Sequence, residues 1–273
     1  MTGLFKAEMK RLTKSRSLIV CIIIAVILGI TVAMLYNYFW EQKGGRIAAS
    51  YALMEQFNMD TEILDTALSS IPEHNIWSFV NIFFTDGTIW ILSAICTCSF
   101  LASEYHTGTL KISISRGCKR EHILFAKFLS GFISVLIVAL AYVGSGSLAA
   151  CFMVELRSEL SFTQMSVILL MYFLLIAASA AVFLMLTVIF QKSGFAVAVI
   201  IAFPMIFSLL INLASMVFEN ASSLSRFLLS SAFMTVQQSV LAGETYITAL
   251  TALGYIILSA IISIAVFNRS EIK

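Results

Sequence analysis

The chain has 273 residues, of which 60% are hydrophobic and 12% are charged, and its formal net charge is +2. Soluble domains average about 45–50% apolar and about 25% charged residues, so this composition excludes an ordinary soluble fold. The small net charge gives no argument for nucleic-acid binding. A lipid bilayer solvates apolar surface directly, which predicts an all-α integral membrane protein.

Six stretches are long and apolar enough to cross a bilayer, since a spanning helix needs about 20 such residues. They are residues 18–39, 79–101, 125–154, 165–190, 195–218 and 247–267. The first stretch follows a cationic segment, as in a signal peptide, but it exceeds the usual apolar run of about 7–15 residues. We therefore expect a retained anchor and one transmembrane domain over residues 1–273.

The lysines and arginines are unevenly distributed between the segments that connect the spans. With the N-terminus inside, 13 of the 17 lie in cytoplasmic segments, and ten of the 15 carboxylates lie outside. Cytoplasmic segments of membrane proteins carry an excess of Lys and Arg. Both termini are therefore predicted to be cytoplasmic.

Three segments outside the spans are predicted to be helical. Residues 1–16 have an apolar and a cationic side, interrupted by Glu8, which indicates an interfacial amphipathic helix or, alternatively, a plain cationic flank. Residues 41–77 form an acidic outer segment, which either attracts a cationic substrate or only complements the cationic inner face. Residues 219–246 are too polar for a lipid-exposed span, so we expect re-entrant or interfacial outer helices.

Polar side chains within the spans are candidates for function. Asp86 is the only carboxylate well inside a predicted span, and an isolated charge there costs about 2.5–3.5 kcal/mol. It either belongs to a substrate path or pairs with a neighbouring helix or with Asn81. Asn212 in the fifth span is a weaker candidate. Small residues at 144–147 and 177–181 predict close helix packing, and Pro204 predicts a kink.

The sequence lacks the motifs of the common hydrolytic sites. It contains no G-x-x-x-x-G-K-[S/T] phosphate loop, no H-E-x-x-H zinc motif and no G-x-S-x-G elbow. We therefore assign no catalytic residue and no metal site, and the chain by itself is not expected to be an enzyme.

The segment 103–124, between the second and third spans, carries a dense polar motif. It reads E-Y-H-T-G-T-L-K over residues 104–111, continues as S-R-G at 115–117, and is followed by Arg120 and Lys127. Gly108 permits a sharp turn, and the following residues can form a short helix on the cytoplasmic surface.

This motif, placed after the second of six spans, resembles the signature of type-2 ABC exporter permeases. The resemblance implies that the short helix is a coupling helix, which docks into a separate ABC ATPase subunit. Two permease copies, as a homodimer, and two ATPases then form the transporter, and ATP and magnesium bind to the ATPase. The residues carried over as coupling elements are Glu104, Tyr105, Thr107, Gly108, Thr109, Leu110, Lys111 and Arg116.

Small stand-alone permeases of this type resemble bacteriocin and toxin-peptide exporters and immunity permeases of the bacterial cell membrane. An amphipathic, antimicrobial or toxin peptide is therefore the expected substrate. A drug or lipid exporter of the same family, an ion-coupled secondary transporter using Asp86, and a non-transporting scaffold are the alternatives. The matched broken helices of inverted-repeat carriers are not evident in the sequence.

Overall fold

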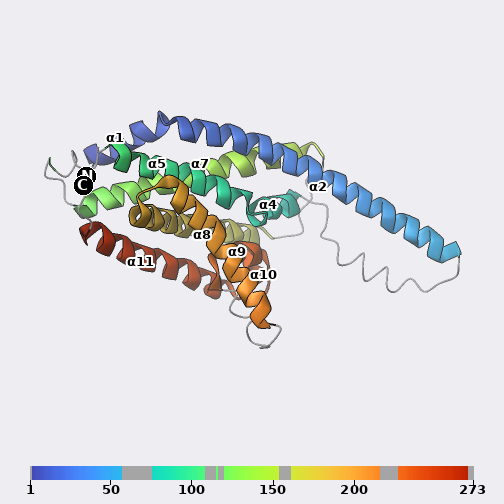
Figure 1. Ribbon diagram of the computed structural model, residues 1–273. Helices are drawn as coiled ribbons and strands as arrows, with labels where there is room; N and C mark the ends of the chain where they lie inside the picture. Colours follow the sequence, from blue (N-terminus) through green and yellow to red (C-terminus); the bar gives the residue numbers. More distant parts are fainter. Residues whose placement is uncertain are drawn as a thin grey trace.

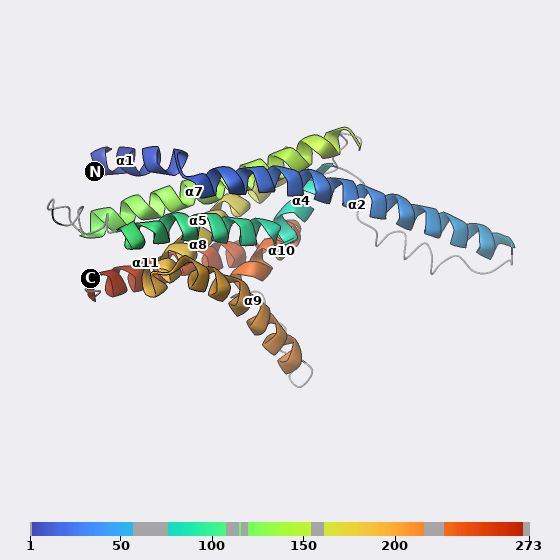
Figure 2. The ribbon, with the colours of Figure 1, turned by 45° about the horizontal axis from the view of Figure 1, so that its top comes forward.

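The computed structural model describes residues 2–56, 76–107, 115, 120–153, 161–215 and 227–269 (Figures 1 and 2). These residues form α-helices and no β-strand, as the all-α prediction requires. An α-helix satisfies its own backbone hydrogen bonds, which a bilayer cannot do. The helices are α1 (Thr2–Thr13), α2 (Arg16–Gln56), α4 (Ile76–Thr85), α5 (Thr88–Thr107), α7 (Arg120–Cys151), α8 (Phe162–Phe190), α9 (Ser193–Ser215), α10 (Leu229–Leu241) and α11 (Thr245–Arg269).

Six of these helices are long and apolar enough to cross a membrane, which confirms the predicted six-span fold. In their most apolar stretches, 56–61% of the residues of α5, α7 and α8 are buried, against 17–28% in α2, α9 and α11. Helices α5, α7 and α8 are therefore the interior of the bundle. The beginning of α1 and the end of α11 lie at the same end of the molecule (Figures 1 and 2). We call this end the termini end.

The second predicted span is not one continuous helix. It is broken at Asp86 and Gly87, between α4 and α5, where Gly87 has φ = 78°. Glycine adopts this left-handed conformation without a steric penalty. The carboxylate of Asp86 accepts a hydrogen bond of 2.9 Å from the backbone N–H of Thr88, as a residue that caps a helix N-terminus does. The Asp-Gly pair, a common turn signal, could have predicted this break.

The first spanning helix is much longer than a bilayer requires. Helix α2 has 41 residues, or about 60 Å at 1.5 Å per residue, against a hydrocarbon core of about 30 Å. Figure 1 shows it projecting far beyond the other helices. Residues 41–56 of the predicted outer segment therefore continue the first span as one helix, and do not form a separate helix. The rest of that segment, up to residue 75, lies outside the described residues.

Helix α10 lies in the described part, residues 227–246, of the segment that we expected to be re-entrant or interfacial. Its 13 residues span about 20 Å, which is too short to cross the membrane. It packs against α8 and α11 and buries its apolar side, namely Leu229, Ala232, Phe233 and Val236. A turn at Gly243, with φ = 74°, leads directly into α11. Residues 219–226 lie outside the described residues.

The predicted small-residue patch in the third span is a packing seam. A Cβ atom built on Gly146 of α7 would collide with the buried ring of Phe83 of α4. A Cβ atom on Gly29 of α2 would collide with the backbone carbonyl of Tyr142 of α7. A Cβ atom added to Gly144 would have no other heavy atom within 4 Å. Glycine is therefore required at 29 and 146 for close helix approach, but not at 144.

Helix α9 bends at Pro204, which lies inside it. Figure 2 shows that the second half of the helix diverges from the bundle. Proline has no N–H, so the carbonyl of Ile200, four residues earlier, loses its helical partner. The indole N–H of Trp90 on α5 donates to this carbonyl at 3.3 Å. Trp90 also packs edge-on against Phe183, with ring centroids 5.1 Å apart. The kink is therefore held by a side chain from another span.

This arrangement predicts an energetic coupling between Trp90 and Pro204. Trp90→Phe leaves the Ile200 carbonyl without a partner, which is expected to cost about 1–3 kcal/mol of unfolding free energy. In a Pro204→Ala background residue 204 regains its N–H, so the same Trp90→Phe change should cost about 1 kcal/mol less. SDS-induced unfolding of the four variants in detergent measures the difference. An equal cost of Trp90→Phe in both backgrounds would contradict the interpretation.

Candidate functional site

The predicted coupling residues lie at and beyond the C-terminal end of α5. Glu104, Tyr105 and Thr107 are in the last turn of this helix. Gly108, Thr109, Leu110, Lys111 and Arg116 lie outside the described residues. The site is therefore built from the end of α5, the start of α7 and helix α1, which packs against α7 and pairs with α5 through Arg11.

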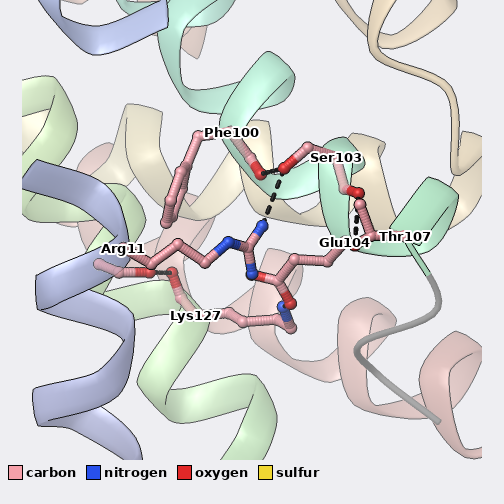
Figure 3. A network of polar contacts seen from close by, with 7 residues as sticks. Arg11, Phe100, Ser103, Glu104, Thr107 and Lys127 are labelled. Atoms are coloured by element: carbon pink, nitrogen blue, oxygen red, sulfur yellow. Dashed lines mark hydrogen bonds and ion pairs between the residues drawn. The ribbon is translucent and has the colours of Figure 1, made fainter. Parts of the chain in front are cut away.

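Glu104 is the centre of this site. Its side chain is only 3% exposed and forms ion pairs with Arg11 of α1 and Lys127 of α7 (Figure 3). The Arg11 Nη1 to Glu104 Oε1 distance is 2.7 Å, and Lys127 Nζ contacts the other carboxylate oxygen. The Lys127 side chain is 2% exposed. Charges buried to this degree are retained only when they are paired, so Glu104 connects three helices.

One carboxylate, Glu104, faces two cations, Arg11 and Lys127. A second carboxylate, that of Glu8 on α1, compensates the remaining positive charge. Its carboxylate has a buried oxygen and interacts electrostatically with both Arg11 and Lys127. Partial burial lowers the pKa of Arg11 below its ordinary value, and Glu8 opposes this shift. The guanidinium stays protonated at physiological pH. Glu8, Arg11, Glu104 and Lys127 thus form a neutral group of two carboxylates and two cations, which we call the charge cluster.

Arg11 has further partners on α5. Its Nη2 donates to the Ser103 hydroxyl at 2.8 Å, and its guanidinium carbon lies 5.2 Å from the centre of the Phe100 ring (Figure 3). Leu12, beside it, is fully buried. The apolar side of α1 therefore packs against protein, and Glu8, which interrupts that side in the sequence, belongs to the charge cluster. Lys6 and Lys10 are exposed, as the amphipathic pattern predicts.

The other described coupling residues have local roles. Tyr105 packs against the core, and its hydroxyl is buried without a hydrogen-bond partner in the described part of the chain. Thr107 is exposed and donates to the Ser103 carbonyl at 3.0 Å. Thr107 is thus the exposed last residue of α5 within the predicted coupling segment.

Arg120, the first residue of α7, connects the site to the last span. Its guanidinium donates to the carbonyls of Phe267 and Asn268 of α11, both at 3.0 Å. The last carbonyls of a helix have no intrahelical partner and carry partial negative charge, so a cation is favourable there. The sequence motif included Arg120 but did not predict this partner.

The three intramembrane polar candidates do not form one site. The carboxylate of Asp86 accepts a hydrogen bond from the hydroxyl of Tyr142 on α7. The side-chain oxygen of Asn81 accepts one of 2.6 Å from Tyr172 of α8. Asp86 thus pairs with a neighbouring helix, as one of the two interpretations expected, and not with Asn81. Asn212 is exposed on α9. The sequence analysis did not identify either tyrosine, although a tyrosine in a span needs a hydrogen-bond partner.

The family model described as ABC-2 family transporter protein matches residues 3–272 of the chain. The chain belongs to the ABC-2 transporter family. This confirms the family to which the sequence motif pointed, and it makes the chain a membrane component that works with an ABC ATPase. No curated protein sequence matches the chain.

In this ABC-2 permease the sequence indicated Glu104, but not its partners Arg11 and Lys127. Arg11 was assigned only to the general excess of positive charge on the inner face, and Lys127 was included in the motif without a partner. The sequence did contain a signal for the pairing of Lys127. A lysine inside an apolar stretch, here the third, requires a carboxylate as its partner. Glu104, just beyond the second stretch, is such a carboxylate at the same end of the bundle.

Proposed function

We propose that this ABC-2 permease is the membrane subunit of an ATP-driven exporter, and that a separate ATPase binds it at residues 103–124. The observation that carries this proposal is the ion pair between Glu104 and Lys127. Glu104 is at the start of the proposed docking segment, and Lys127 follows its end by three positions. Both ends of the segment are thereby connected to the same buried group.

This connection supports a mechanical role for the segment. A displacement of residues 103–124 by the ATPase would move the end of α5 and the start of α7 together, because their charges are paired. Arg11 would carry the movement to α1, and Arg120 would carry it to α11. The energy enters from the partner, which binds ATP and magnesium.

We infer a multi-pass orientation in the bacterial cytoplasmic membrane with both termini in the cytoplasm. The cation asymmetry of the sequence supports it, and so does the position of α1 and the end of α11 at one end of the bundle (Figure 2). As in the family that the motif resembles, two permease copies would form a homodimer around the pathway, with two ATPase copies beneath them.

The proposed substrate is an amphipathic peptide, such as a bacteriocin or toxin. Two apolar cavities of about 160 and 310 Å³ are lined by Trp90 and Pro204, among other residues, at the bend of α9. Cavities of this kind suit apolar side chains or acyl chains. A drug or a lipid is therefore the alternative substrate for the same exporter.

A second function has one observation in its favour. Asp86 is an exposed carboxylate at a helix break, and broken helices form ion sites in secondary transporters. Its hydrogen bonds to Tyr142 and Thr88 favour a structural role instead. Transport that needs an ion gradient but no ATPase, and that stops in Asp86→Asn, would support this alternative.

The docking proposal is tested by matched charge reversals. We expect Lys111→Glu to weaken binding of the ATPase about tenfold or more, because the change replaces attraction with repulsion at the docking surface. Lys192→Glu, in the exposed turn between α8 and α9, makes the same charge change on the same proposed face and should bind normally. Co-purification with the ATPase encoded next to this chain, and stimulation of its ATP hydrolysis, are the measurements. Equal effects of the two variants, or no complex with the unmodified chain, would overturn the proposal.

A further inference from the structure

A cationic pocket of about 460 Å³ opens at the termini end, beside the charge cluster. It lies between the junction of α1 with α2 and the last turns of α5. Its cations are Arg11, Lys14 and Arg16, and its hydroxyl groups include those of Ser17, Ser99 and Ser103. Neither the family membership nor the proposed docking of an ATPase explains this group of residues.

The positive charge of the pocket is only partly compensated. Arg11 is paired with Glu104. Lys14 and Arg16 are exposed, and neither forms an ion pair with any carboxylate in the described part of the chain. The pocket therefore has two cations available for an anionic ligand.

Two hydroxyl groups of the pocket are also available as donors. Serines in helices commonly donate to a carbonyl one turn earlier, as Ser103, Ser130 and Ser134 do here. Ser17 and Ser99 form no such bond, nor any other hydrogen bond to a described residue. Together with Lys14 and Arg16 they form a donor set suited to an oxyanion with several acceptor atoms.

The position of the pocket along the helices favours a lipid as the source of that anion. The candidate membrane-spanning stretch of α2 begins at Arg16 and that of α5 ends at Tyr105, so we place the pocket near the level of the lipid headgroups. Directly beyond it, Ile19, Val20 and Ile23 of α2 expose apolar side chains, which suit acyl chains. A soluble anion would make no use of this surface.

We propose that this pocket binds the phosphate of an anionic phospholipid headgroup, with Lys14 and Arg16 as charge partners and Ser17 and Ser99 as donors. The bound lipid bridges the α1–α2 junction and α5, and it contacts Arg11 of the charge cluster. With the termini in the cytoplasm, as proposed above, this lipid belongs to the cytoplasmic leaflet, so that placement rests on the proposed orientation. Binding itself needs neither that orientation nor an ATPase, so the two proposals fail independently.

Native mass spectrometry of the purified full chain in neutral detergent tests this binding. A neutral micelle carries no surface potential, so it removes general attraction to a charged membrane. We expect phosphatidylglycerol to bind about tenfold more tightly than phosphatidylcholine, whose choline is repelled by the two cations. The double variant K14Q/R16Q should lose this preference, and Ser99→Ala should reduce it several-fold.

The matched control is K6Q/K10Q, which removes the same charge from exposed positions of α1 outside the pocket. Retention of the phosphatidylglycerol preference in this control supports the pocket, and an equal loss in both double variants overturns it. No preference in the unmodified chain also overturns it. Displacement of phosphatidylglycerol by inorganic phosphate at an equal concentration would assign the pocket to a soluble anion and overturn the headgroup proposal. Unchanged thermal unfolding shows that each variant is folded.

Discussion

Glu104→Gln is expected to lower the free energy of unfolding by about 3–5 kcal/mol, which is the usual cost of removing one partner from a buried ion pair. The change leaves Lys127, a side chain only 2% exposed, without its carboxylate. It also removes the Arg11 ion pair, so α1, α5 and α7 lose their common contact. SDS-induced unfolding of the purified protein in detergent measures this loss.

Two further variants show whether the loss comes from the ion pair. Glu121→Gln removes a carboxylate from an exposed position at the start of α7 and should change stability by less than about 0.5 kcal/mol. Glu104→Leu combined with Lys127→Met replaces both charges by apolar groups and should recover most of the stability. A double variant as unstable as Glu104→Gln, or a Glu104→Gln protein as stable as Glu121→Gln, would show that the pair does not connect the helices.

The second large effect is expected at the seam between α4 and α7. Gly146→Val places two methyl groups and a Cβ atom where the buried Phe83 ring already lies. Overpacking of this kind costs about 1–3 kcal/mol, and more when a backbone has to move. The displaced ring also contacts Tyr142, with centroids 5.5 Å apart, and Tyr142 bonds Asp86. The thermal unfolding temperature in detergent should therefore fall by several degrees.

Gly144→Val is the matched control, two residues away on the same helix. Nothing lies within 4 Å of its added Cβ atom, so no steric cost is expected. The change in helix propensity is only a few tenths of a kcal/mol. If both valine variants unfold at the same temperature, the seam tolerates side chains and the close approach at Gly146 is not required.

The number of spans and the all-α membrane fold were predictable because both depend on local sequence. About 20 consecutive apolar residues must cross a bilayer whatever their neighbours are, and the six predicted stretches correspond to six apolar helices. The break at Gly87 was also encoded locally, by the Asp-Gly pair, although continuous apolar composition concealed it. The continuation of α2 to Gln56 was not predictable from the length of its apolar stretch. That length shows only where the helix leaves the bilayer, and a helix can continue in water for any number of residues.

The partners within the site depended on contacts between distant residues. The sequence placed Glu104 in a recognisable motif, but Arg11 lies 93 positions earlier and Lys127 belongs to another helix. The same holds for Trp90 and the Ile200 carbonyl, which are 110 residues apart. No periodicity within one helix indicates which residue of another helix it will meet.

By itself, the sequence determined the membrane class, the six spans and the motif of the ABC-2 family, since these follow from composition and from short runs of residues. Only the tertiary structure decided that Glu104 is buried between Arg11 and Lys127, that Gly146 but not Gly144 is needed for packing, and that Lys14 and Arg16 share a pocket. The physical reason is that hydropathy is a property of each segment alone. The pairing of a buried charge is a property of the helices that surround it.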